Sequence, residues 1–146
     1  ELVGSKAYEL AADPKKNLNA PGLKSTVPYL DFSPLLNTLD ALEGEAESFS
    51  KIDFTSLPKS KREALNKLLM KSEQQLTSVD GLPRRSWYKH QIYAPGFYTG
   101  YGVKTLPGVR EAVEQRDWKE AQSEIEKLAG TLKSMADHLN GINALN

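Results

Sequence analysis

The most regular hydrophobic pattern of this chain lies near its C-terminus. Apolar residues recur there at alternating spacings of three and four, which places them along one face of a helix expected over residues 118–142. Asp117 and Glu120 have the spacing of a capping box at the start of this helix. Because other helices must bury their apolar stripes against something, the seam should face the domain's own core, with Leu132 fully buried. The seam consists of Trp118, Ala121, Ile125, Leu128, Leu132, Met135, Leu139 and Ile142.

Four further helices follow from periodicity and from helix boundary signals. We expect them over residues 2–12, 34–51, 58–78 and 107–116, the last leading directly into the C-terminal helix. No segment alternates strictly between apolar and polar residues, as a half-buried strand would. The fold class expected is therefore all-α, a bundle of three or four long helices with short extras. The two middle helices should bury Leu35, Leu39, Leu42, Ala46 and Phe49, and Leu65, Leu68, Leu69, Ser72 and Leu76.

A long segment between residues 81 and 107 has a different character, because half of the chain's aromatic residues gather there among glycines. The glycines suit a tight, irregular backbone, and the aromatic content argues against disorder. Two interpretations stay open: a lid packed over the bundle, or a binding loop that presents tyrosine hydroxyls. Residues 96–104 should form the more mobile tip of this loop. The residues expected to anchor the loop to the bundle are Trp87, Tyr88, His90, Tyr93 and Pro95.

Composition narrows the class of protein. Lys and Arg number 19 and Asp and Glu also number 19, so the 146-residue chain has no net charge. This balance argues against a nucleic-acid-binding protein and against a polybasic membrane-surface protein. The absence of cysteine excludes disulfides, thiolate metal ligands and a thiol nucleophile. The length suits a single domain, and a start at Glu1 rather than Met suggests a processed product or a piece of a longer protein.

Residues that carry chemistry are sparse. The two histidines, His90 and His138, lack the spacing of a helical metal-binding pair, and we expect neither a metal site nor a catalytic residue in this chain. His138 lies beside the seam and is expected at the surface or at the edge of the core. His90 opens the aromatic loop, where it either pins the loop through a hydrogen bond or takes part in function. On these residues alone the chain is a helical scaffold or interaction domain.

The sequence from Gly81 to Pro95, Gly-Leu-Pro-Arg-Arg-Ser-Trp-Tyr-Lys-His-Gln-Ile-Tyr-Ala-Pro, resembles a motif of the transferrin receptor-like dimerisation domain. That domain is the C-terminal helical part of glutamate carboxypeptidase II and its relatives, transferrin receptor among them. The similarity continues through Tyr101 into the last helix and is weak before residue 30. The resemblance implies a helical bundle that packs across the two-fold axis of a homodimer, with a zinc aminopeptidase-like domain upstream.

The resemblance also implies a role for the loop tip. In carboxypeptidases of this family, a Lys-Tyr pair in the loop binds the carboxylates of a C-terminal glutamate. Tyr101 matches the tyrosine of that pair, whereas Gly100 stands at the lysine position and Lys104 lies nearby. A tyrosine hydroxyl still donates one hydrogen bond to a carboxylate, but the stronger charge-assisted partner is missing. The Arg-Gly-Asp motif with which transferrin receptors hold transferrin is absent as well.

These observations lead to one hypothesis and two alternatives. The chain is expected to be one domain over residues 1–146, a non-catalytic homodimerisation domain of a glutamate carboxypeptidase-like zinc peptidase, whose loop 96–104 completes the substrate pocket of the upstream peptidase domain. It should need no cofactor itself, with zinc in the upstream domain, and its partners should be a second copy and the upstream domains, not nucleic acid or a membrane. The alternatives are a receptor-like or adaptor domain in a protein without peptidase activity, and a free-standing helical enzyme. Family resemblance suggests an extracellular, lumenal or vacuolar location.

Overall fold

The structure is a computed structural model that describes residues 1, 3–7 and 21–145. The chain is mostly helical, as predicted, with one small two-stranded sheet. Most of the helix expected over residues 2–12 falls outside the described residues. The elements in chain order are α2 (Ser33–Ser50), α3 (Lys59–Leu69), the short 3-10 helix η1 (Glu73–Leu76), β1 (Tyr93–Pro95), β2 (Val103–Thr105), α4 (Pro107–Gln115) and α5 (Trp118–Asn143).

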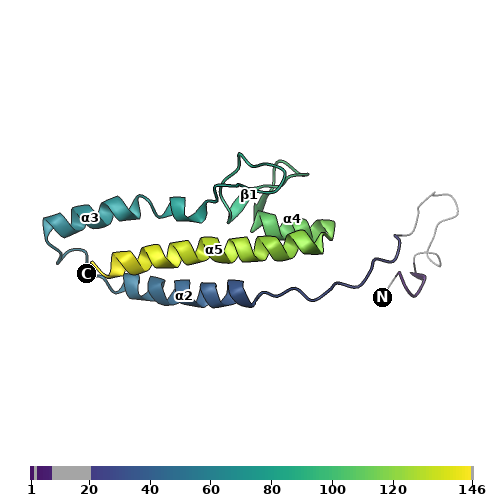
Figure 1. The fold of residues 1–146 in the computed structure, drawn as a ribbon, viewed down its shortest axis with the longest axis horizontal. Coiled ribbons are helices and arrows are strands. Elements are labelled where there is room, and N and C mark those ends of the chain that lie inside the picture. The colour runs from purple at the N-terminus through teal and green to yellow at the C-terminus, as the bar shows by residue number, and fades with distance from the viewer. Residues whose placement is uncertain (2, 8–20, 146) are drawn as a thin grey trace.

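α5 is the central helix of the molecule. Figure 1 shows it between α2 on one side and α3, η1 and α4 on the other. Its predicted seam is buried at six positions and half-buried at Trp118 and Met135. Further residues beside the seam, Glu124 and Ala129 among them, are buried too, because neighbouring elements cover α5 from more than one direction. The seam prediction is therefore confirmed, and Leu132 is 8% exposed.

Two apolar clusters form the core, and α5 contributes to both. In the first cluster, Leu35 of α2 and Val109 of α4 pack against the N-terminal half of α5. In the second, Leu65 of α3 packs against Leu139 and Ile142 at the other end of α5. A single long helix thus connects the two clusters, and the hairpin region and α3 are each attached to their own part of it.

α2 buries a narrower stripe than the spacing of its apolar residues predicted. Leu35 is buried and Leu42 and Phe49 are half-buried, whereas Leu39 is 47% exposed and Ala46 is exposed. The three inward residues repeat every seven positions, so they follow the line along which α2 contacts α5. The expectation of burial was wrong at Leu39 and Ala46 because these residues lie beside that contact line and face solvent.

The single helix expected over residues 58–78 is divided in the structure. α3 ends at Leu69, and the Lys71 amide donates to the Leu68 carbonyl at 2.8 Å, an i to i+3 bond that tightens the chain into a turn before η1. Nε2 of His138 lies 3.0 Å from the same Leu68 carbonyl, which joins the end of α3 to α5. His138 is half-buried there, at the edge of the core as expected.

Candidate functional site at the hairpin loop

The aromatic segment contains a short hairpin that the sequence pattern did not predict. β1 and β2 pair antiparallel, with Tyr93 opposite Thr105 and Pro95 opposite Val103. Each strand has three residues, too few for an alternating pattern to be recognised in a sequence. The hairpin lies next to α4, over the N-terminal part of α5 (Figure 1).

The turn between the strands is closed by its own backbone. The Gly96 amide donates to the Gly102 carbonyl at 3.0 Å, and the Gly100 amide donates to the Gly96 carbonyl at 2.9 Å. Gly100 has φ +66°, in the left-handed region that favours glycine. Tyr101 follows it with a relative exposure of 102%, so its side chain is available to a group outside this chain.

Lys104, the cation nearest to Tyr101 in the sequence, is engaged at the base of the hairpin. Its Nζ pairs with the Glu114 carboxylate of α4, and its side chain is only 13% exposed. The hydrogen bond from Lys104 lowers the pKa of Glu114, with a further contribution from Arg110. The aliphatic part of Lys104 lies close to Gly96, where an added Cβ would meet Cε at 3.1 Å. Lys104 therefore stabilises the base of the hairpin and does not accompany Tyr101 at the tip.

A buried ion pair holds the hairpin to α4. Nη2 of Arg85 donates to both carboxylate oxygens of Glu111 at 3.0 Å, and the two side chains are 7% and 3% exposed. One of these oxygens also accepts the Phe97 amide at 2.8 Å. The Phe97 ring centroid lies 5.7 Å from the guanidinium carbon of Arg85, within the range of a cation–π contact. One buried carboxylate thus joins α4, the hairpin and the segment that precedes the hairpin.

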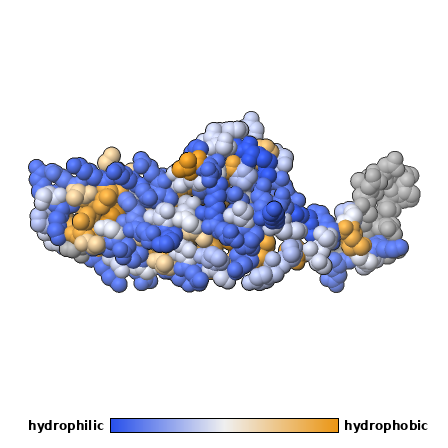
Figure 2. Space-filling view, viewed as in Figure 1, coloured by the Kyte–Doolittle hydropathy of each residue, from blue (hydrophilic) through white to orange (hydrophobic). Residues whose placement is uncertain are grey.

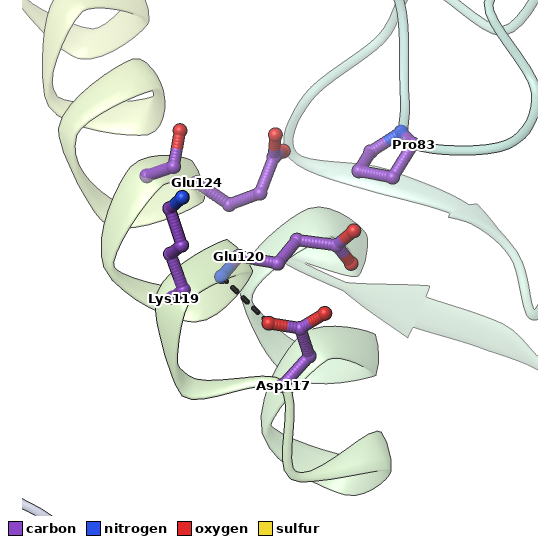
Figure 3. Close-up of a pocket in the computed structure, with 6 residues that line it drawn as sticks. Pro83, Asp117, Lys119, Glu120 and Glu124 are labelled. Atoms are coloured by element: carbon purple, nitrogen blue, oxygen red, sulfur yellow. Dashed lines mark hydrogen bonds between the residues drawn. The ribbon is translucent and has the colours of Figure 1, made fainter.

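A second, more exposed ion pair joins the same preceding segment to α5. Arg84 donates to the two carboxylate oxygens of Glu120 at 2.9 and 2.7 Å. Asp117 caps α5 by accepting the Glu120 amide at 2.9 Å, an interaction that the capping-box spacing predicted. Figure 3 shows the shallow pocket beside these groups, whose lining residues provide capping and ion pairing but no nucleophile paired with a base. The lining residues are Pro83, Asp117, Lys119, Glu120, Ser123 and Glu124.

Glu124 is the carboxylate in this pocket whose titration is perturbed. The residue is 8% exposed, and burial raises its pKa, while the charge of Lys127 opposes the shift. Its Oε2 lies so close to Gly108 that a Cβ added there would approach it to 2.2 Å. Gly108 stands in the first turn of α4, where the helix dipole favours a negative charge. The geometry fits a structural carboxylate that packs against the start of α4.

His90 connects the start of β1 to η1. Its Nδ1 accepts the amides of Ile92 and Tyr93 at 3.2 and 3.3 Å, and its Nε2 lies 2.9 Å from Oε1 of Glu73. The Tyr93 hydroxyl donates to the same Glu73 oxygen at 2.9 Å, and this hydrogen bond raises the pKa of Tyr93. These contacts agree with the first interpretation of His90, a hydrogen bond that pins the loop.

The other residues expected to anchor the loop lie nearer to solvent. Trp87 is 76% exposed, so its ring does not anchor the loop by burial, and that expectation is corrected. The Tyr88 amide donates to the Arg85 carbonyl at 2.9 Å, which closes a tight turn over residues 85–88 that contains Trp87. Pro95 is exposed and Tyr93 is 46% exposed, while Tyr88 is half-buried, and an anchoring role for Tyr88 and Tyr93 stays a prediction. The side chains buried in this segment are Leu82, Arg85, Gln91 and Ala94.

Two further findings bear on the chemistry of the site. Over residues 1, 3–7 and 21–145, no group of three or more His, Asp or Glu side chains is placed to hold a metal ion. None of the helices in that part of the chain is long and apolar enough to cross a membrane.

The fold and the site define a class of protein: a helical domain in which a hairpin, held by a buried ion pair, presents a fully exposed tyrosine. A family model described as the transferrin receptor-like dimerisation domain matches residues 30–140. The chain belongs to this family.

Curated relatives carry the matching region within much longer chains. A probable glutamate carboxypeptidase of Arabidopsis thaliana is 32% identical over 119 residues, which cover 77% of this chain and 18% of that protein. A probable glutamate carboxypeptidase of Arthroderma benhamiae is 28% identical over 126 residues, covering 84% of this chain and 17% of that protein. An inactive zinc metalloprotease of Schizosaccharomyces pombe is 29% identical over 105 residues, which cover 68% of this chain and 13% of that protein. This chain therefore spans less than a fifth of the length of these relatives.

Proposed function

We propose that this chain is a non-catalytic homodimerisation domain of a glutamate carboxypeptidase-like zinc peptidase, and that its loop 96–104 completes the substrate pocket of that protein's peptidase domain. Family membership and the names of two relatives support the general assignment. The observation that carries the role of the loop is Tyr101, fully exposed at the tip of a hairpin that the Arg85–Glu111 pair attaches to the bundle. In this proposal zinc belongs to the peptidase domain.

The chemistry of the tip indicates how it would recognise a substrate. The Tyr101 hydroxyl can donate one hydrogen bond to a substrate carboxylate. Gly100 offers no side chain, and Lys104 is engaged with Glu114, so this loop adds no ammonium group beside the tyrosine. A neutral hydrogen bond is weaker than a charge-assisted one. We therefore expect the loop to favour an acidic C-terminal residue less strongly than a loop with a Lys-Tyr pair would.

The loop's role is tested with the longer protein that carries this domain. Tyr101→Phe removes one hydroxyl, and a lost hydrogen bond of about 0.5–1.5 kcal/mol should raise KM for a glutamate-terminated peptide roughly 2- to 13-fold, with kcat nearly unchanged. Tyr98→Phe is the matched control, because Tyr98 lies in the same turn but its hydroxyl is directed to Gln115 of α4. A KM that stays unchanged in both Tyr101→Phe and Tyr101→Ala would show that the tip does not contact substrate.

Self-association is tested separately. The isolated 146-residue chain should sediment as a monomer or as a concentration-dependent dimer, because the seam of α5 is used within its own core. The longer protein should form a stable dimer, since other domains would enlarge the contact towards the size typical of obligate homodimers. A longer protein that stays strictly monomeric would overturn the dimerisation function.

The second candidate function is a receptor-like or adaptor domain in a protein without peptidase activity. The relative in Schizosaccharomyces pombe, whose name describes an inactive zinc metalloprotease, favours it. The two candidates differ in the zinc content of the longer protein, measured by metal analysis, and in the presence of His, Asp and Glu zinc ligands in its peptidase region. Bound zinc with peptidase activity supports the first candidate, and the absence of both supports the second.

A further inference from the structure

The turn at the end of the hairpin, residues 96–102, is closed on itself. Besides the hydrogen bonds of the Gly96 and Gly100 amides, the Tyr101 amide donates to the Thr99 carbonyl at 2.7 Å. Figure 2 shows the region of the hairpin as a projection from the edge of the molecule. Because these bonds keep the residues of the turn in place relative to one another, the position of Tyr101 depends on how the turn is joined to the helices.

Phe97 joins the turn to the helices through its amide and its ring. The amide donates to the Glu111 carboxylate of α4 at 2.8 Å. The ring centroid lies 5.7 Å from the guanidinium carbon of Arg85 and 5.8 Å from that of Arg84. Both distances are within the range, about 6 Å, over which a cation is attracted to an aromatic face. Since Arg85 pairs with Glu111 and Arg84 with Glu120 of α5, one ring is linked to both helices.

The backbone at Arg84 allows two adjacent arginines to approach one ring. Consecutive side chains of an extended strand point to opposite sides, so a strand would direct only one of the two towards Phe97. Arg84 instead has φ +61°, in the left-handed region that few residues other than glycine adopt. The Arg85 amide donates to the Leu82 carbonyl at 3.1 Å and closes the turn. Rarely populated backbone conformations of this kind are concentrated at functional sites.

Tyr98 provides a second contact between the turn and the helices, and it is weaker. Its hydroxyl lies 3.4 Å from Oε1 of Gln115, a long distance for a hydrogen bond between two exposed side chains. The Tyr98 ring also packs edge-on against the Phe97 ring, with the centroids 4.9 Å apart. The contact of Tyr98 therefore depends in part on the position of Phe97.

We infer that Phe97 is a positioning residue for Tyr101: its ring, held by the guanidinium groups of Arg84 and Arg85, fixes the turn that presents the tyrosine hydroxyl. The inference rests on the proposed role of loop 96–104 and adds the side chain that sets the place of its tip. Without the aromatic ring the turn stays closed but shifts relative to α4 and α5. The Tyr101 hydroxyl then meets a substrate carboxylate in a smaller fraction of the complexes, because recognition depends on accurate placement of the donor.

The test uses the longer protein that carries this domain and compares two substitutions of Phe97. Phe97→Leu keeps an apolar side chain but removes the aromatic face, and it should raise KM for a glutamate-terminated peptide towards the value of Tyr101→Phe, roughly 2- to 13-fold, with kcat nearly unchanged. Phe97→Tyr keeps the aromatic face and should leave KM within about twofold of the wild type. Circular dichroism confirms that each variant is folded.

A double variant distinguishes positioning from a general structural effect. In a protein that already carries Tyr101→Phe, the change Phe97→Leu should raise KM no further, because a positioning residue acts only through the group that it positions. Arg84→Ala, which removes one of the two guanidinium groups, should raise KM in the same direction and should also add nothing to Tyr101→Phe. Phe54→Leu is the matched control, since the same change is then made in the apolar cluster at the other end of α5, and it should leave KM unchanged.

The outcomes separate this inference from the proposed function. If Tyr101→Phe raises KM but Phe97→Leu does not, Phe97 does not position the tip and the role of the loop stands. A rise in KM that is as large in the Tyr101→Phe background as in the wild type would also overturn the inference, because Phe97 would then act on another group. If neither Tyr101→Phe nor Tyr101→Ala changes KM, the role of the loop itself fails, and the inference falls with it.

Discussion

Arg85 and Glu111 are 26 residues apart in the chain and form an ion pair in which both side chains are buried. Nε of Arg85 has no hydrogen-bond partner within the described residues. The buried positive charge of the guanidinium is therefore balanced by the carboxylate of Glu111. Glu111 also receives the Phe97 amide at the base of the loop tip. The position of the tip and the stability of the domain are therefore linked through one carboxylate.

Removing the charge of Glu111 should destabilise the domain strongly. Glu111→Gln leaves the Arg85 guanidinium buried without a counter-ion, and breaking a buried pair on one side typically costs about 3–5 kcal/mol. Urea denaturation followed by circular dichroism measures the loss. Glu114→Gln is the matched control, because Glu114 also pairs with basic residues but its side chain is 45% exposed, and exposed pairs contribute about 0–1 kcal/mol. Equal, small losses in both variants would mean that the Arg85–Glu111 pair is solvated in solution.

Hydrogen exchange should distinguish the tip of the loop from its base. Amides of residues 98–99 should exchange faster than those of residues 92–94, since Ile92 and Tyr93 donate to His90 and Ala94 is buried in the strand pair. The Phe97 amide should be an exception within the tip, because its acceptor is the buried Glu111 carboxylate. Strong and uniform protection through residue 104 would favour the packed lid over the presented binding loop.

The buried Glu124 predicts a specific dependence of stability on pH. Burial raises the pKa of Glu124, so the folded state binds this proton more readily than the unfolded state does. Its contribution to stability is therefore fully present below the ordinary carboxyl pKa and is lost as the pH rises through the raised pKa. Glu124→Gln removes the ionisation, so the free energy of unfolding of the variant, relative to the wild type, should increase from acidic to neutral pH.

The design of this experiment depends on what remains near residue 124. Lys127 keeps its hydrogen bond to the Gly81 carbonyl in the Glu124→Gln variant, so the substitution does not leave a cation without a partner. Glu126→Gln, two residues away on the exposed face of α5, is the control and should show no such trend. If the free energy of unfolding of Glu124→Gln, relative to the wild type, instead decreases with rising pH, the charge of Lys127 and not burial determines the pKa shift of Glu124.

The helices could be predicted from the sequence where packing follows a regular repeat. The seam of α5 was predicted residue by residue because its alternating spacings match helix geometry over its whole length. The division after Leu69 could not be predicted, since it arises from a turn closed by the backbone and from His138 on a distant helix. Periodicity also cannot distinguish the side of α2 that meets α5 from the exposed side at Leu39, because both carry leucines.

The candidate site was predictable only in part. The glycines indicated a tight, irregular backbone, and the structure places Tyr101 in a turn closed by its own backbone hydrogen bonds. The sequence does not indicate the Arg85–Glu111 ion pair that holds this turn. Arg85 follows another arginine and Glu111 lies in a charged stretch, so both residues would be expected at the solvent-exposed surface. Trp87 was expected to anchor the loop to the bundle, whereas its side chain is 76% exposed in the structure.

Leu132 provides the most direct test of the core. It lies in the cluster that joins α2, α4 and α5, and it is 8% exposed. Leu132→Ala should lower the free energy of unfolding by about 2–5 kcal/mol, through the lost burial of the removed atoms and the cavity that they leave. Leu23→Ala is the matched control, because the same atoms are removed from a side chain that is 78% exposed, and surface substitutions usually change stability by about 0.5 kcal/mol or less. A loss below about 1 kcal/mol at Leu132 would mean that this side chain does not lie in the core and that the register assigned to the seam is wrong. Since the hairpin reaches the bundle through α4, which packs on this same cluster, the Leu132→Ala variant should also exchange the Phe97 amide faster, and the Leu23→Ala variant should not.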